Sequence, residues 1–302
     1  MDQDGFDPVP GVVERLEPGI RRILAPNPSP MTYRGTNTYL LGEGHVAVID
    51  PGPALPAHQR AILDALAPGE VISHIFVTHS HIDHSPLAAP LALATGAAIH
   101  AFGDSYAGRS EVMTSLAAAG LTGGGEGVDP DFEPHELLAD EVTVDAGGVQ
   151  LTALWTPGHF GNHLCFAYGD AVFTGDHVMG WASTMVSPPD GDLTAFMATT
   201  ARLAARGDRV FYPGHGAAIS QPAARAEWLI AHRKGREAAI LARLDGFGTD
   251  IPALTRAIYT EVPVALLFAA ERNVFAHLID LHQKNQIQAD PHLSRSARFF
   301  RA

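Results

Sequence analysis

The chain has 302 residues, of which 46% are hydrophobic and 18% are charged, a composition typical of globular proteins and not of disordered ones. No apolar run approaches the roughly 20 residues that a membrane span requires, so we expect no membrane partner. Cys165 is the single cysteine, which excludes intrachain disulfides and thiolate zinc sites. Because the acidic start, MDQDGFDPVPGV, lacks the features of a secretory signal, we expect a cytoplasmic protein.

The net charge of −13 is unevenly distributed along the chain. Residues 1–224 carry 9 Lys and Arg against 25 Asp and Glu, a balance of −16. Residues 225–302 carry 11 against 8, a balance of +3. This asymmetry predicts two domains, a larger one over 1–224 and a smaller one over 225–302. The acidic domain is expected to repel polyanions, whereas the smaller one is not.

Several apolar, β-rich runs end in a reactive residue. We predict strands over 45–50, 71–81 and 208–215, and hairpins over 142–159 and 163–177 that turn at Gly147-Gly148 and Gly169-Asp170. The reactive residues at or near their ends are Asp50, the histidines within 79–84, His159, Asp176 and His215. Buried strands that all end in polar side chains predict a functional site along one rim of a sheet system.

Helical patterns lie between these strands. Ser85 and Pro86 predict a helix that starts directly after His84 and ends at Gly96. Residues 192–207 place apolar side chains on one face, which predicts a second helix. Strands and helices that alternate in this way predict an α+β fold in which helices cover the sheets.

Two further regions have a distinct character. The stretch 104–140 is rich in glycine and acidic residues, and we expect a solvated surface loop there, with a lid over the site as the alternative. From residue 225 onwards the pattern is helical and poor in strands, which predicts three short helices in a helical or winged-helix-like appendage.

The stretch THSHIDHS, residues 78–85, places three histidines and one aspartate within six positions. Neutral imidazoles at this spacing offer lone pairs to an electrophile, which predicts a metal centre rather than a histidine-rich turn. The predicted ligands are His79, His81 and His159 for one metal, Asp83, His84 and His215 for a second, and Asp176 between the two. We expect two Zn²⁺ ions per chain, with iron or manganese as alternatives, and a shared hydroxide as the nucleophile. Asp83 and Asp176 are expected to be catalytic.

Other reactive residues are assigned supporting roles. Asp50 is expected to orient a ligand histidine by accepting its distal N–H. His163 and His177 are candidates for substrate contact or for packing behind the ligands, and Cys165 for the core. Of the other histidines, we expect His45, His135, His232, His282 and His292 at the surface, and His74 and His100 in the core or behind the ligands.

The motifs THSHIDH, TPGH, TGDH and PGHG, in this order and at these spacings, resemble the metallo-β-lactamase superfamily. The stretches NPSPMTYRGTNTYLLG, TGDHVMG, YPGHG, AHRKGREAAIL and HLIDLHQKNQI resemble its β-lactamase-like protein 2 branch. The resemblance implies an αββα sandwich with a dinuclear zinc site between the sheets and a C-terminal winged-helix-like domain. It also implies, residue by residue, the ligand roles given above. The chain departs from the branch at WASTMVSPPDG, residues 181–191, and in the stretch 104–140.

Three functional hypotheses follow. The first is a phosphodiesterase that cuts single-stranded RNA, as members of the branch do, with phosphates contacted by the metals, Arg34, Arg233, Lys234 and Arg236. The second is a small-molecule hydrolase of thioesters or lactones, similar to glyoxalase II, with Arg34 as a candidate cation in the cleft. The third is a non-catalytic binding module with structural zinc, which seven ligands for two metals disfavour. A homodimer supported by the C-terminal domain is a further expectation.

Overall fold

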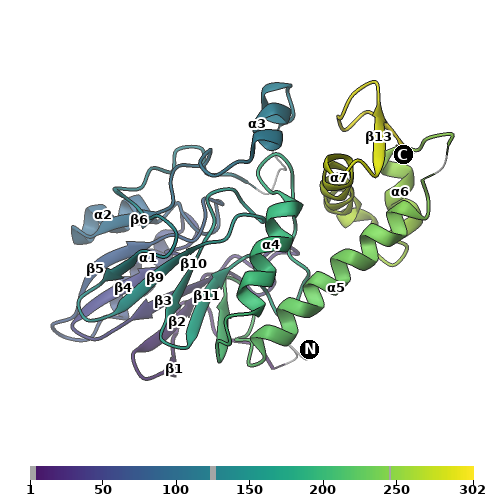
Figure 1. Cartoon of the computed structure of the whole chain (residues 1–302). Coiled ribbons are helices and arrows are strands. Elements are labelled where there is room, and N and C mark those ends of the chain that lie inside the picture. Colours follow the sequence, from purple (N-terminus) through teal and green to yellow (C-terminus); the bar gives the residue numbers. More distant parts are fainter. Residues whose placement is uncertain (1–4, 123–126, 245) are drawn as a thin grey trace.

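The computed structural model describes residues 5–122, 127–244 and 246–302, and its two large sheets pack face to face between layers of helices (Figure 1). The predicted sandwich of sheets covered by helices is therefore present. Each of the predicted strands and hairpins forms, although β5 ends at Phe76, before the histidine motif. This placement leaves the motif in the loop between a strand end and the next helix.

The first sheet has seven strands in sequence order. Strands β1 to β4 are antiparallel, and β4 to β7 are parallel, because helices or long connections link them. The strands are β1 Val13–Glu17, β2 Ile20–Leu24, β3 Asn37–Leu41, β4 His45–Ile49, β5 Val71–Phe76, β6 Ala98–Ala101 and β7 Glu136–Leu137.

The second sheet has five strands in the order β12-β11-β10-β9-β8. Its antiparallel pairs β8–β9 and β10–β11 are the two predicted hairpins, with their turns at the glycines that the sequence indicated, and β12 adds in parallel to β11. The strands are β8 Thr143–Asp145, β9 Gln150–Trp155, β10 Leu164–Tyr168, β11 Ala171–Gly175 and β12 Val210–Pro213.

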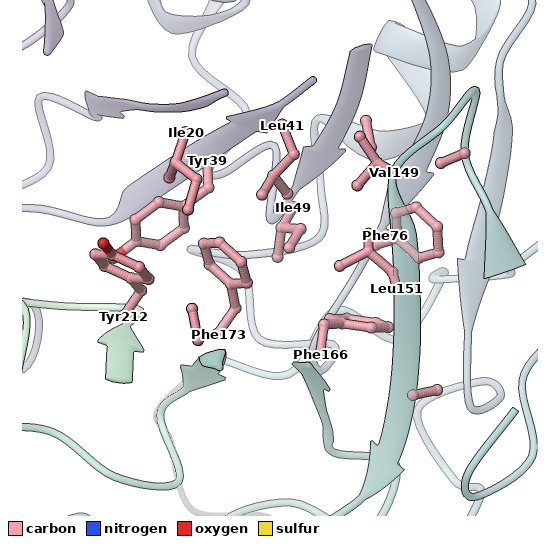
Figure 2. Close-up of a cluster of buried hydrophobic side chains, with 14 of the residues drawn as sticks. Ile20, Tyr39, Leu41, Ile49, Phe76, Val149, Leu151, Phe166, Phe173 and Tyr212 are labelled. Atoms are coloured by element: carbon pink, nitrogen blue, oxygen red, sulfur yellow. The ribbon is translucent and has the colours of Figure 1, made fainter. Parts of the chain in front are cut away.

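The main hydrophobic core lies between the two sheets (Figure 2). Tyr39 and Ile49 of the first sheet face Phe166 and Phe173 of the second, and the four side chains are at most 2% exposed. Each buried side chain of this size contributes about 1.5–3 kcal/mol to the free energy of unfolding through removal of apolar surface from water. This core fixes the two sheets relative to each other, and with them the strand ends along their common rim.

Helices cover the outer face of each sheet. Helices α1 Pro56–Asp64 and α2 Ala88–Thr95 pack on the first sheet through Ile62 and Leu91. Helices α4 Leu193–Ala204 and α5 Pro222–Leu241 pack on the second through Leu203 and Leu229. The inner strands of each sheet therefore bury apolar side chains on both faces, which explains their nearly continuous hydrophobic runs.

Helix α2 begins later than the sequence predicted. Residues 81–87 form turns instead, in which the backbone N–H groups of His84 and Ser85 donate to the His81 carbonyl. The Ser85 hydroxyl donates to Asp129 Oδ2 at 2.7 Å, so it does not cap the helix. Because the loop must aim its histidines at the rim, it cannot also take up helical geometry directly after His84.

The stretch 104–140 is not simply a solvated loop. It contains helix α3 Glu111–Ala118, whose Met113 and Leu116 are buried in the core of the C-terminal region. Residues 127–129 pair with the histidine loop, since Ile82 N–H donates to the Gly127 carbonyl and Asp129 N–H to the Ser80 carbonyl. The described part of this stretch thus braces the site from outside and reaches the C-terminal helices; residues 123–126 lie outside the described part.

The C-terminal region is built around α5, which starts at Pro222 and runs from the second sheet to the remaining helices (Figure 1). Helix α5 is 20 residues long and thus not a short helix. Because it spans residues 224 and 225, the predicted domain boundary falls within a helix. A two-stranded ribbon follows the helices, as in a winged-helix-like domain. The elements are α6 Ile251–Ile258, η1 Val264–Leu266, α7 Leu267–Gln283, β13 Ile287–Asp290 and β14 Arg298–Arg301. Within the described residues, none of the helices combines the length and apolar character needed to cross a bilayer.

The docking of α3 is testable by mutation. Met113→Ala should lower the free energy of unfolding by about 2–5 kcal/mol, because the side chain is buried among apolar groups of the C-terminal region and leaves a cavity. Chemical denaturation measures this change. Thr114→Ala, on the exposed side of the same helix, is the control and should change stability by less than about 0.5 kcal/mol. Equal effects of the two substitutions would show that α3 is not packed as described.

Candidate metal centre

Asp50 and the predicted metal ligands all follow strand ends on one rim of the sandwich. Asp50 directly follows β4, and the loop of residues 78–85 follows β5. His159 comes four residues after β9, Asp176 directly after β11, and His215 two residues after β12. Residues that are up to 165 positions apart, from Asp50 to His215, therefore meet in one place.

Three histidines form a first group of converging ring nitrogens. His81 Nδ1 lies 2.9 Å from His79 Nε2 and 3.1 Å from His159 Nε2. All three side chains are buried. Their ligand atoms lie within 4.8 Å of one another, as a shared metal ion requires.

A second group adjoins the first and contains the carboxylates. His215 Nε2 lies 3.1 Å from Asp83 Oδ2 and 3.4 Å from His84 Nε2, and the distance from His84 Nε2 to Asp83 Oδ2 is 3.3 Å. Asp176 lies between the groups: Oδ1 is 3.4 Å from His84 Nε2, and Oδ2 is 3.3 Å from His215 Nε2 and 3.8 Å from His159 Nε2. Its carboxylate can therefore reach ions in both groups.

These separations fit divalent metal ions. Tetrahedral ligands about 2.0–2.1 Å from zinc lie roughly 3.3–3.4 Å apart, close to the 3.1–3.4 Å within the second group and a few tenths of an ångström longer than the 2.9 and 3.1 Å in the first. Asp176 Oδ1 is buried without a hydrogen-bond partner, which is costly unless a cation satisfies it. The seven residues thus form two adjacent ligand sets that fit metal ions.

Four of the imidazoles have their other ring nitrogen held from outside the cluster. The acceptors are Thr78 Oγ1 for His79 Nδ1, Asp50 Oδ2 for His84 Nδ1, the Met185 carbonyl for His159 Nδ1 and the Gly35 carbonyl for His215 Nδ1, at 2.7–3.0 Å. In a neutral ring, each such bond places the proton on the outer nitrogen and leaves the lone pair of Nε2 facing inward, toward a metal ion.

Asp50 is the most heavily engaged of these acceptors. It is 2% exposed and accepts the backbone N–H of Thr78, the Thr78 hydroxyl and the His84 Nδ1–H, each at 2.7–2.9 Å. One carboxylate therefore fixes both the start of the histidine loop and the orientation of a histidine within it.

The protonation of the two groups differs. Burial, together with the neighbouring His159, lowers the pKa of His81 to about 3, so this ring is neutral at ordinary pH. Burial alone would also lower the pKa of His84, but the carboxylates of Asp83, Asp176 and Asp50 raise it well above its usual value. Negative charge is thus concentrated around the second group, where a cation is stabilised most.

Gly214 permits the close approach of these groups. A Cβ atom at this position would lie 2.5 Å from Asp176 Oδ1 and 2.7 Å from His84 Cε1. A larger residue at position 214 would therefore displace the Asp176 carboxylate and the His84 imidazole.

A pocket of about 370 Å³ opens onto the centre. Apart from the site residues, its wall is largely apolar, with Met31, Met179 and Met185 as its most polarisable groups. The other lining residues are Asn27, Ser29, Thr32, Pro53 and Ile82. Thr32 Oγ1 donates to the Asn27 carbonyl, and Ser29 Oγ accepts the Thr32 N–H. In the part of the chain that the structure describes, no Lys or Arg lines this pocket.

The predicted cations of the cleft are elsewhere. Arg34 lies outside the pocket lining, over the ring of Tyr33 and 3.7 Å from Asp7. Arg233 is 2% exposed and bonded inside the protein, so it is unable to contact a phosphate. Arg236 donates to the Ile258 carbonyl, while Lys234 is exposed. The expected basic cluster was wrong for Arg233, because tertiary contacts bury a side chain that its sequence neighbours suggested to be on the surface.

The supporting histidines pack behind the ligands. His163 is fully buried, bonded to Thr156 Oγ1, and its ring lies 5.1 Å from that of His79. His177 is also fully buried, and its Nε2 lies 3.0 Å from Thr200 Oγ1. Neither lines the pocket, so contact with a substrate is not favoured.

The remaining histidines and the cysteine occupy varied positions. His45, His135 and His292 are exposed as expected, whereas His232 and His282 are half-buried, and His74 and His100 stack on each other beside the core. Cys165 is buried in the core, and burial raises the pKa of its thiol to about 12.

Several buried or pocket-lining residues lacked a recognisable sequence signal. The histidines His58 and His277 are buried, yet no pattern around them indicated this. Met179 and Met185 line the pocket, although single methionines carry no motif. The one available signal was the departure from the branch pattern at residues 181–191. This range includes Met185, whose carbonyl accepts the Nδ1–H of His159.

Family models match both parts of the chain. Residues 31–215 match the model described as Metallo-beta-lactamase superfamily. Residues 251–294 match the Beta-lactamase associated winged helix domain, which confirms the predicted C-terminal fold.

Individual proteins agree with these matches. The lactamase-like protein nscB of Trichophyton rubrum is 31% identical and is aligned over 81% of this chain and 68% of its own. The atrochrysone carboxyl ACP thioesterase of Aspergillus fumigatus is 30% identical over 77% of this chain and 67% of its own.

Among solved structures, a metallo-beta-lactamase family protein of Thermus thermophilus has a TM-score of 0.75 at 26% identity, covering 95% of this chain and 100% of its own. A beta-lactamase domain protein of Burkholderia ambifaria has a TM-score of 0.81 at 21% identity, covering 99% and 98%, and shows the shared fold.

The ligand sets at the strand ends, the two-sheet sandwich and the family match over most of the chain agree with one another. The chain therefore belongs to the metallo-beta-lactamase superfamily and is a hydrolase of that superfamily.

Proposed function

We propose that this hydrolase cleaves small-molecule thioesters at a dinuclear metal centre. The observation that carries the proposal is the pocket over the centre, whose wall beyond the ligands is largely apolar, contains three methionines and has no Lys or Arg among the described residues. Such a wall favours an uncharged acyl group over a polyanion, and flexible thioether side chains adapt to acyl groups of different shape.

The metal ligands would be the two sets described above, with Asp176 shared. His79, His81 and His159 would present ring nitrogens to one ion, and Asp83, His84 and His215 would surround the other. Bound metals would lower the pKa of a water molecule and polarise the carbonyl of the substrate. The protein residues hold the geometry, because each fixed Nδ1–H bond prevents the ring from turning away.

The leaving group also favours a thioester. A free thiol has a pKa of about 8.5, so a thiolate departs without a proton from the protein. The polar side chains in the pocket wall beyond the ligands, such as Thr32 and Ser29, are engaged in local hydrogen bonds and are poorly placed to donate one. Amides and unactivated esters, whose leaving groups are more basic, need such a donor.

The comparisons support the same substrate class. One relative, 30% identical to this chain, is named as an acyl-carrier thioesterase. That name describes the relative and not this chain. The bond that the relative's name implies, a thioester, is one that the pocket described above could accept.

Cleavage of single-stranded RNA is less well supported. That hypothesis needed Arg34 and Arg233 to contact a phosphate backbone, but Arg233 is buried, and Arg34 lies outside the pocket lining and beside Asp7. The resemblance to the β-lactamase-like protein 2 branch, the cytoplasmic location, the homodimer and zinc as the metal stay predictions.

Metal content is the first test. Protein purified without chelators should contain close to two equivalents of metal per chain, mostly zinc, because two ligand sets with imidazole and carboxylate groups adjoin each other. Elemental analysis of the purified protein measures this. One equivalent of iron would contradict the proposed centre and point to oxidative chemistry instead.

Asp50 provides a test of how the ligands are oriented. Asp50→Ala should weaken metal binding about 10–100-fold, because His84 loses the acceptor that aims its ring. Competition with a chromophoric chelator measures the affinity. Glu133→Ala, which removes an exposed carboxylate outside the site, should bind metal as the unaltered protein does. Unchanged binding by the Asp50 variant would show that the loop orients His84 without it.

Substrate class is decided by direct comparison. The metal-loaded protein should hydrolyse an S-acyl thioester much faster than the oxoester with the same acyl group, and should leave a single-stranded RNA oligonucleotide intact. Release of free thiol and gel analysis of the RNA give the two readouts.

Asp176→Ala should abolish thioester hydrolysis without unfolding the chain, since the bridge between the ions is lost while the core strands stay. Cleavage of RNA without thioester turnover would overturn the proposal.

A further inference from the structure

The segment 179–187, which follows β11 and passes beside the metal centre, is held by residues of the C-terminal helices. Arg225 of α5 donates to the Met179 carbonyl at 2.7 Å and to the Ala182 carbonyl at 2.6 Å. Arg233 of α5 donates to the Thr184 carbonyl, and Arg272 of α7 donates to Ser187 Oγ at 2.7 Å. Three buried arginines therefore fix the course of this segment.

The same segment contacts two of the proposed metal ligands. Thr184 Oγ1 donates to the backbone carbonyl of Asp176 at 2.8 Å. The Met185 carbonyl accepts the Nδ1–H of His159 at 2.7 Å. The orientation of the His159 ring thus depends on where the Met185 carbonyl points.

That carbonyl belongs to a peptide unit whose other end is held by α7. The N–H of Val186 donates to Asn273 Oδ1 at 3.1 Å. Because a trans peptide is planar, with its N–H and C=O pointing in opposite directions, fixing the Val186 N–H also fixes the Met185 C=O. Arg233 Nη1 donates to the same Asn273 oxygen at 2.8 Å and so holds the amide in place.

Arg233 occupies this position at a cost in stability. It is 2% exposed, and both of its hydrogen bonds go to neutral oxygens rather than to a carboxylate. Burial lowers the pKa of its guanidinium to about 10. A buried cation with neutral partners tends to destabilise the folded state, so the position of Arg233 is better explained by a specific contact than by a gain in stability.

We propose that Asn273 and Arg233 are positioning residues for the metal centre: they fix the peptide between Met185 and Val186, and through it the ring of His159. The C-terminal domain thereby completes the first ligand set although it contributes no ligand to it. This inference rests on the proposed dinuclear centre.

Asn273→Ala is the central variant. It removes the acceptor for Val186 N–H, and the affinity of one of the two metals should fall about 10–100-fold, while the second metal should bind nearly as before. Chelator competition on the full chain, with Zn²⁺ as the probe, measures both affinities. Asn273→Asp keeps an oxygen acceptor for both Val186 and Arg233, and it should restore the affinity to within a few-fold.

Arg236→Ala is the matched control. Arg236 lies on the same helix as Arg233, but it donates to the Ile258 carbonyl within the C-terminal region. Its loss should lower the thermal stability of the metal-free protein without changing metal affinity. Should Asn273→Ala fail to fold, Asn273→Ser keeps a polar group there that is too short to reach Val186, and it should show the same loss.

The outcomes separate the two proposals. If the unaltered protein binds two Zn²⁺ ions and Asn273→Ala binds them equally well, the positioning role is refuted while the metal centre stands. If Arg236→Ala weakens binding as much as Asn273→Ala, the effect is general destabilisation and the positioning role is likewise refuted. If the unaltered protein binds no metal, the proposed centre itself is wrong.

Discussion

Imidazoles can converge on one small volume only if each ring has a defined proton position and a fixed orientation. In this protein, four of the five site imidazoles obtain both from a hydrogen bond between Nδ1 and an oxygen outside the cluster. Without those acceptors, nitrogens about 3 Å apart would compete for protons and the rings would turn away from each other. The acceptors lie in different parts of the chain, so the geometry of the centre depends on the whole sandwich being assembled.

The core between the sheets provides that assembly. Tyr39 links the two sheets directly, because its ring packs on Phe173 and its hydroxyl donates to the Pro213 carbonyl at 2.7 Å. Pro213 ends the strand that precedes His215, and Asn37, two residues before Tyr39, donates to the same carbonyl. A shift between the sheets would therefore move His215 relative to Asp50 and the histidine loop. Packing and site geometry are coupled through these few contacts.

The residues that converge at the candidate centre could be predicted from the sequence because their information is local. Each ligand lies within a few residues after an apolar run, and the spacing within THSHIDHS is readable without knowing the fold. The positions of Arg233 and α3 were not readable in this way. Arg233 stands among charged and polar neighbours that suggest an exposed helix face, and its burial depends on the carbonyl of Thr184, 49 residues away. Met113 and Leu116 give too short an apolar pattern within a glycine-rich stretch to indicate a partner.

Charge counts were misleading for the same reason. The balance of +3 in residues 225–302 suggested a surface for polyanions, yet Arg225, Arg233 and Arg272 are at most 7% exposed. These guanidinium groups donate to the backbone and side-chain oxygens of segment 179–187 and of Asn273. The cationic excess of this region thus lies partly inside the protein, where it serves to hold a loop.

The segment 179–187 combines two structural roles. Its side chains Met179 and Met185 form part of the pocket wall, and their exchange would alter the fit of an acyl group. Its backbone carries the acceptor for His159 and is held by α5 and α7 through main-chain groups. Because those contacts do not involve the methionine side chains, the pocket can change its shape while the metal ligands keep their orientation.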